Sequence, residues 1–187
     1  PLAASRSFLK GVAVGICFLA LAGLAFGQAP AARAFDALLR KHVAWNASGT
    51  ASTVDYAGFA KDRGALKAVL DSMSAVPKAS FDGWSKPQQM AFLINAYNAF
   101  TVELILTKCP DLKSIKDLGS FVQSTWKKKF FILLGEERHL DWVEHEQLRP
   151  RYNEPRGHAA ANRASIGCPA LRDQAFTSAK RVAHSED

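Results

Sequence analysis

Hydrophobic residues recur at helical spacing in two stretches of the first half of the chain. Phe35, Leu38, Leu39 and Val43 form the first stripe, and Leu66, Val69, Leu70 and Met73 form the second. Spacings of three and four residues bring such side chains onto one face, so each stripe predicts a helix with one buried side. The pattern breaks over residues 46–53, residues 54–56 (VDY) are predicted to be extended, and Pro77 is predicted to end the second helix.

The middle of the chain is apolar on nearly all sides of a predicted helix over residues 87–106. A helix of that kind is typical of the centre of a domain. Asn95 and Asn98 interrupt it at a spacing of three residues, which places both amides on one face. A buried amide without a partner costs about 1–3 kcal/mol, so both must be hydrogen-bonded. They either clamp the backbone of a loop in the core or orient a catalytic group.

The second half of the chain predicts a hairpin followed by a helix. Residues 129–134 (KFFILL) form the first strand, residues 135–136 the turn, and residues 138–140 the return strand. Asp141 is predicted to cap a helix that carries His145 in its second turn. Helices, a buried central helix, a hairpin and a further helix make an α+β fold rather than a regular βαβ alternation.

The first 34 residues have the features of a signal peptide. Arg6 and Lys10 precede an apolar run over residues 12–26, which is too short to span a bilayer. Cleavage before Phe35 is predicted, with residues 25–27 (AFG) as a second candidate site. The prediction is a leader over residues 1–34, one domain over residues 35–187, a periplasmic or secreted location and no stable membrane insertion after cleavage. The alternative is an uncleaved N-terminal anchor.

Charge and cysteine spacing exclude several classes of function. The chain holds 24 Lys+Arg and 17 Asp+Glu, and removing the leader with its three bases leaves 21 basic residues and a net charge of +4. That excess is too small for a nucleic-acid-binding protein. No Gly-rich phosphate loop and no pair of Cys or His at zinc spacing is present. The sequence therefore predicts no nucleic-acid partner, no metal and no cofactor.

Candidate chemistry gathers in residues 158–171 (HAAANRASIGCPAL), which place a histidine, an amide and a serine within ten residues before Cys168. Pro169 follows at once and is suited to the first turn of a helix. A thiol at a helix N-terminus ionises more readily, which makes it a better nucleophile. Two other readings stay open: Cys168 is a small buried hydrophobe, or it forms a disulfide with Cys109.

Three motifs carry a resemblance to a known family. They are residues 95–98 (NAYN), residues 140–145 (LDWVEH), and His158 followed by Asn162, Ser165 and Cys168-Pro169. In combination they resemble the family of domain of unknown function 547 in bacteria and plants, over residues 85–176. The resemblance implies an exported α+β domain, and its Cys and His invite comparison with papain-like or transglutaminase-like thiol hydrolases.

Two departures from the family pattern stand out. Arg163 occupies a position where family members commonly have a second cysteine, which leaves Cys168 as the thiol of this segment. The end of the chain, residues 177–187 (TSAKRVAHSED), is short and polar where the family continues with further helix and strand. The chain therefore resembles a member truncated at its C-terminus.

The enzyme hypothesis assigns a role to each candidate residue. Cys168 is the nucleophile, His158 is the base that takes its proton, and Asn162 or Asn95 is the orienter or oxyanion donor. His145 is the rival base. Both histidines precede the cysteine, so a papain-like site would be permuted. The substrate is an unidentified peptide or small molecule. The competing hypothesis is a non-catalytic envelope domain that binds a peptide, glycan or partner protein in a cleft. A further alternative is an inactive, truncated remnant of the family domain.

Overall fold

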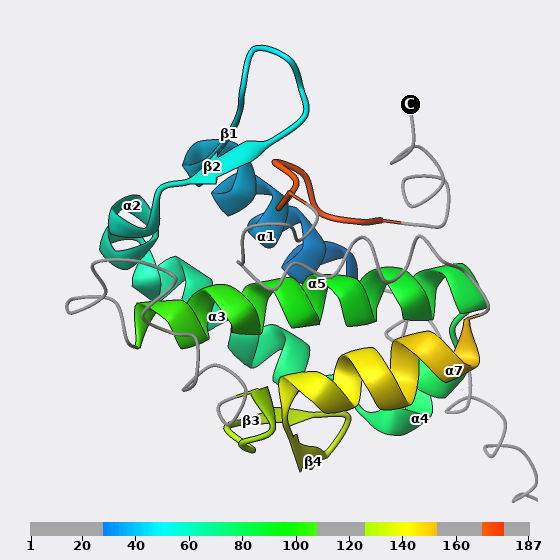
Figure 1. Cartoon of the computed structure of the whole chain (residues 1–187). Coiled ribbons are helices and arrows are strands. Elements are labelled where there is room, and N and C mark those ends of the chain that lie inside the picture. Colours follow the sequence, from blue (N-terminus) through cyan, green and yellow to red (C-terminus); the bar gives the residue numbers. More distant parts are fainter. Residues whose placement is uncertain (1–27, 108–125, 153–169, 178–187) are drawn as a thin grey trace, which may run out of the picture.

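A long central helix, α5 (Lys86–Leu106), is the element against which four other helices pack (Figure 1). The computed structural model describes residues 28–107, 126–152 and 170–177. The predicted buried helix is confirmed, since α5 has sixteen buried residues among its 21. Its N-terminus is fixed by the Gln88 side chain, which accepts the Ser85 backbone N–H at 3.0 Å.

The N-terminal helix, α1 (Gln28–His42), buries the predicted stripe and is followed by a small hairpin. Strand β1 (Val43–Trp45) pairs antiparallel with β2 (Ser52–Val54), with Val43 opposite Val54. The prediction of Val43 as a helical residue is thus wrong. Val43 instead begins strand β1 through its pairing with Val54, one residue after α1 ends in basic residues that favour a helix C-terminus.

Three shorter helices lead to α5. Asp55 caps α2 (Tyr56–Lys61) by accepting the Gly58 N–H at 2.9 Å, so the expected extended piece ends before this residue. Helix α3 (Arg63–Ser74) buries the second predicted stripe, as expected. Pro77 does not terminate α3 directly, because it occupies the N-cap of the next helix, α4 (Lys78–Asp82).

The predicted hairpin is present with its turn one residue earlier than expected. Strand β3 (Phe131–Leu133) pairs antiparallel with β4 (Glu136–Arg138). Leu134 and Gly135 form the turn with φ values of 54° and 84°. Two successive positive φ values match the twist of a tight hairpin, and Gly135 supplies one of them without strain.

The helix after this hairpin is wound as a π-helix, η2 (Trp142–Leu148), and continues into α7 (Arg149–Arg151). The prediction of Asp141 as its N-cap is wrong. Asp141 already has helical dihedral angles and makes no side-chain cap bond. His139 takes that role, because its Nδ1 accepts the Trp142 N–H at 2.9 Å.

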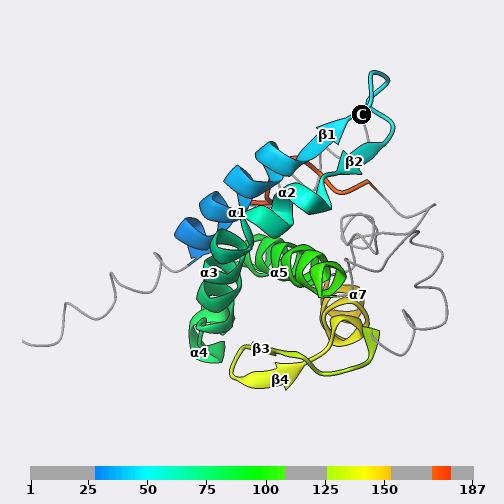
Figure 2. The ribbon, with the colours of Figure 1, turned by 90° about the vertical axis from the view of Figure 1, so that its left-hand side faces the viewer.

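Figure 2 looks nearly along α5 and shows how the other elements surround it. α1 covers one side, α3 and α4 a second, and α7 with the β3–β4 hairpin the remainder. Among the described residues the sheets are two antiparallel pairs, β1–β2 and β3–β4. This mixture of many helices and small sheets agrees with the predicted α+β class. Within the same residues no helix is long and apolar enough to cross a membrane.

Candidate functional site

The buried amide of Asn95 holds the backbone of the C-terminal segment. Its Nδ2 donates to the Phe176 carbonyl at 2.6 Å, and its Oδ1 accepts the Phe176 N–H at 2.9 Å. Asn95 is 2% exposed and Phe176 3%. Two bonds to one residue fix both the position and the direction of that backbone. Asn95 therefore acts on the chain just beyond the Cys168 segment, and Asn98, 4% exposed, lies one turn further along α5.

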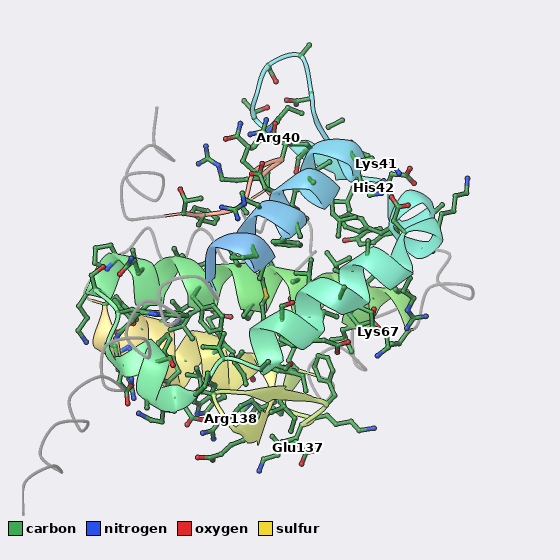
Figure 3. The ribbon with its side chains drawn as sticks, turned by 180° about the vertical axis from the view of Figure 1, so that it is seen from behind. Arg40, Lys41, His42, Lys67, Glu137 and Arg138 are labelled. Carbon is green, nitrogen blue, oxygen red and sulfur yellow. The ribbon has the colours of Figure 1, made fainter. Side chains whose placement is uncertain are left out.

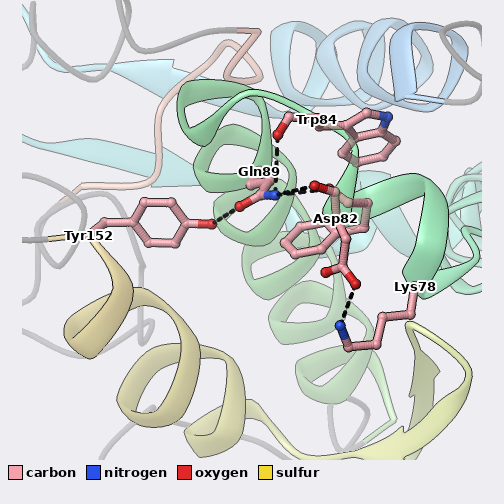
Figure 4. Close-up of polar contacts among 6 residues, drawn as sticks. Lys78, Asp82, Trp84, Gln89 and Tyr152 are labelled. Carbon is pink, nitrogen blue, oxygen red and sulfur yellow. Dashed lines mark hydrogen bonds and ion pairs between the residues drawn. The ribbon is translucent and has the colours of Figure 1, made fainter.

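A second buried amide, Gln89, holds the chain at the other end of the same segment. The Tyr152 hydroxyl donates to Gln89 Oε1 at 3.0 Å, while Nε2 donates to the carbonyls of Phe81 at 3.0 Å and Trp84 at 3.2 Å (Figure 4). Burial raises the pKa of Tyr152 to about 12, an effect that the nearby Arg151 opposes. The phenol is therefore neutral and able to donate at physiological pH.

Sequence reasoning missed both partners of this contact. Gln89 lies at the start of the apolar run. A polar residue in such a run indicates a buried hydrogen bond, and this signal could have identified Gln89. Tyr152 carries no local signal, because the contact spans 63 residues of chain.

A buried carboxylate lies between α5 and η2. Glu144 is 1% exposed, and its Oε2 accepts the Tyr97 hydroxyl at 3.2 Å while Oε1 faces Arg149 at 3.3 Å. Tyr97 in turn stacks on Trp126, with ring centroids 6.0 Å apart. Both Tyr97 and Glu144 belong to the motifs noted in the sequence, although neither was singled out. Their contact joins the two motifs across the core.

His145 lies on the outer side of the same π-helix. Its side chain is 40% exposed, and Nε2 is 3.8 Å from Asp141 Oδ1 one turn earlier. An exposed imidazole can act as a general base, and a neighbouring carboxylate can orient its ring. π-helical turns recur at functional sites, and here the turn carries the predicted rival base.

The remaining candidates, Cys168, His158 and Asn162, lie outside the described residues. The structure does describe the chain on either side of their segment. There, Tyr152 is hydrogen-bonded to Gln89 and Phe176 to Asn95. In the parts of the chain that the structure does describe, no group of three or more Cys, His, Asp or Glu side chains is arranged to hold a metal ion.

A family model described as "Protein of unknown function, DUF547" matches residues 81–185. The chain belongs to this family. The match covers more than half of the chain and includes the range 85–176 on which the motifs predicted it. Curated proteins and solved structures gave no match.

The DUF547 match begins within α4, so α5, the β3–β4 hairpin and η2 all belong to the family region. The contacts of Asn95 and Gln89 also lie inside it. In contrast, α1, the β1–β2 hairpin, α2 and α3 precede the DUF547 match. These N-terminal helices pack against α5, the central helix of the matched region.

Proposed function

We propose that this DUF547 protein is an exported thiol hydrolase that cleaves peptide or amide bonds. Cys168 is the nucleophile, His158 is its base, and His145 is the alternative base. The thiolate attacks the carbonyl carbon, the imidazolium returns the proton to the leaving amine, and water then hydrolyses the thioester. Asn162 is the proposed oxyanion donor, and Asn95 is a positioning residue.

The proposal is carried by the paired hydrogen bonds between Asn95 and Phe176. Together with the bond between Gln89 and Tyr152, they attach both ends of the Cys/His segment to one rigid helix. Reactive groups need fixed mutual geometry, and buried amides on a central helix supply fixed attachment points.

The test compares the alkylation rates of Cys168 and Cys109 in the folded, full-length protein. Iodoacetamide at pH 6–7 should label Cys168 first, because an ordinary thiol with a pKa near 8.5 is mostly protonated there. His158→Ala should slow this labelling and His145→Ala should leave it unchanged. A larger effect of His145→Ala would make His145 the base.

A second candidate, a non-catalytic binding domain, is favoured by a groove of about 770 Å³ between α3, α5 and β3. Leu70, Phe100, Leu104 and Phe131 contribute apolar walls, and the 47% exposed Ile132 lies on its rim. Charged side chains line the same groove, among them Lys67, Glu103 and Glu137, so a peptide that combines apolar and charged side chains suits it. Equal labelling of Cys168 and Cys109 in every variant would favour this binding function over the hydrolase.

Export is part of the proposal and is supported by Arg6 and Lys10 ahead of the apolar run over residues 12–26. Cleavage before Phe35 would remove Ala31 and Ala32, which are buried side chains of α1. Cleavage after residues 25–27 would keep both of them. We therefore place the start of the mature protein at Gln28.

A further inference from the structure

The groove between α3, α5 and the β3–β4 hairpin has an aromatic wall. Its volume of about 770 Å³ is in the range of pockets that bind small ligands. Phe100 of α5 stacks on Phe131 with ring centroids 4.0 Å apart, and the ring of Phe130 lies at a steep angle to that of Phe131 at 4.8 Å. All three side chains line the groove. The faces of such rings attract apolar groups and cations.

Glu103 of α5 lines the same groove and has one carboxylate oxygen bonded and the other not. Oε1 accepts from Arg63 Nη2 at 2.7 Å, and this hydrogen bond, together with the charge of Glu103, raises the pKa of Arg63. Oε2 is buried, and no donor in the described part of the chain bonds to it. The side chain as a whole is 19% exposed, so a ligand can reach it. A buried acceptor without a donor costs free energy, which a donor from a ligand would recover.

The other charged side chains of the groove do not satisfy this oxygen. Asp71 and Glu137 add two carboxylates to the lining, and Lys67 and Lys128 add two ammonium groups. Figure 3 labels Lys67 on α3 and Glu137 on the hairpin. Within the described residues, the ion pair of Glu103 is with Arg63, and neither lysine contributes to it. The groove therefore offers a carboxylate oxygen beside an aromatic wall, which suits a cation on an apolar stem.

We propose that the groove binds a peptide segment through one Lys or Arg side chain, which donates to Glu103 Oε2 while neighbouring apolar side chains of the peptide pack on the aromatic wall. Leu70 and Leu104 supply aliphatic contacts for the methylene stem of that basic residue. An acidic side chain at the same place would be repelled by Glu103. The inference rests on the binding function proposed for this groove and on no property of Cys168.

Two substitutions separate recognition of a cation from a structural role of the ion pair. Glu103→Gln keeps the shape of the side chain and removes its charge, so it should weaken binding of a basic peptide at least tenfold. Arg63→Gln removes the cation that competes for Glu103, so it should tighten binding by about twofold or more. Both substitutions break the same ion pair. A purely structural role would therefore change the affinity in the same direction in both variants.

Glu136→Gln is the matched control. Glu136 is another carboxylate of the hairpin region in an ion pair, with Arg138 Nη2 at 2.9 Å, and its side chain is 65% exposed. Its substitution should leave the affinity within about twofold of the wild-type value. Circular dichroism of each variant checks that the helices are intact.

The probe is a library of random nonapeptides displayed on phage and selected against the full-length protein. The wild type should enrich peptides that combine Lys or Arg with apolar residues, and Glu103→Gln should lose the preference for the basic residue. The most enriched peptide is then synthesised with its basic residue intact and with norleucine in that place. Fluorescence polarisation gives the Kd of both peptides for each variant. The norleucine peptide should bind the wild type at least tenfold more weakly than its parent.

The outcomes separate the inference from the binding function on which it rests. If no peptide is enriched above background, the binding function of the groove fails and the inference fails with it. If peptides are enriched with no preference for a basic residue or with an acidic one, the role of Glu103 alone is overturned. Equal affinity of the basic peptide for the wild type and Glu103→Gln, or weaker binding to Arg63→Gln, would also overturn that role.

Discussion

Among the glycines that the structure describes, Gly58 is the one where a single added carbon should disturb the most structure. A Cβ atom built on this α2 glycine would fall well inside 3.0 Å of both Asp55 Oδ2 and His42 Nδ1, and 2.7 Å from His42 Cε1. Figure 3 shows His42 with Arg40 and Lys41 at the C-terminal end of α1. Gly58→Ala must therefore push away the cap of α2, the ring of His42, or both.

The magnitude follows from what each of these side chains holds. His42 is 6% exposed, its Nε2 lies 2.7 Å from Asp62 Oδ2, and its ring packs on Phe59 with centroids 4.7 Å apart. Forcing a group into such packing costs about 1–3 kcal/mol. Weakening the Asp55 cap costs about 1 kcal/mol more. The higher helix propensity of Ala over Gly offsets about 1 kcal/mol of this cost, so the free energy of unfolding should fall by about 2 kcal/mol.

Gly64→Ala is the matched control, because Gly64 is also in the first turn of a helix, α3, and a Cβ there would meet nothing within 4 Å. Urea unfolding should show Gly58→Ala less stable by about 2 kcal/mol and Gly64→Ala more stable by about 0.5–1 kcal/mol. The melting temperature of Gly58→Ala should fall by about 4–8 °C.

A double-mutant cycle identifies the cause. If the clash is with His42, the losses from Gly58→Ala and His42→Ala should add to more than the loss in the double variant. A Gly58→Ala protein as stable as the wild type would refute this account of the α1–α2 contact. Strict additivity would assign the loss to the Asp55 cap instead.

Two further predictions concern Tyr152 and the N-terminus. With its pKa raised to about 12 in the fold against about 10 unfolded, neutral Tyr152 stabilises the protein fully below pH 10, and this contribution is lost as the pH rises toward 12. Absorbance at 295 nm should show a late-ionising contribution that Tyr152→Phe removes; ionisation of Tyr152 near pH 10 in the folded protein would contradict the burial argument. Mass spectrometry of the exported protein should give Gln28 as the first residue, and a start at Phe35 would show that the buried Ala31 and Ala32 of α1 are dispensable.

Local pattern was enough to predict the helices that bury one face or nearly all of their surface. Helix α5 and the stripe of α3 were predicted correctly. The spacing of apolar residues in the sequence shows directly which face of a helix, with its 3.6-residue period, will be buried. The β3–β4 hairpin was also found, although its turn was misplaced by one residue. The turn depends on which residues adopt positive φ, and Leu134 gives no signal that it does so.

Caps and short strands were decided by tertiary contacts. Asp141 is a better capping residue than His139 by propensity, yet the backbone already turns into the helix before Asp141. Strand β1 forms because Val43 pairs with Val54 across the hairpin. The residues 43–45 by themselves do not predict this pairing.

In the candidate site, too, the sequence determined some features and the tertiary structure determined others. The sequence alone determined that Asn95 and Asn98 must be buried and bonded, because an amide in an apolar helix has no other stable state. It could not determine the partners. Asn95 binds Phe176 across 81 residues and Asp36 binds Ala175 across 139, and such pairs exist only after α1, α5 and the C-terminal segment have packed together. Residue order fixes which groups require a partner, whereas the packing of distant elements selects the partner.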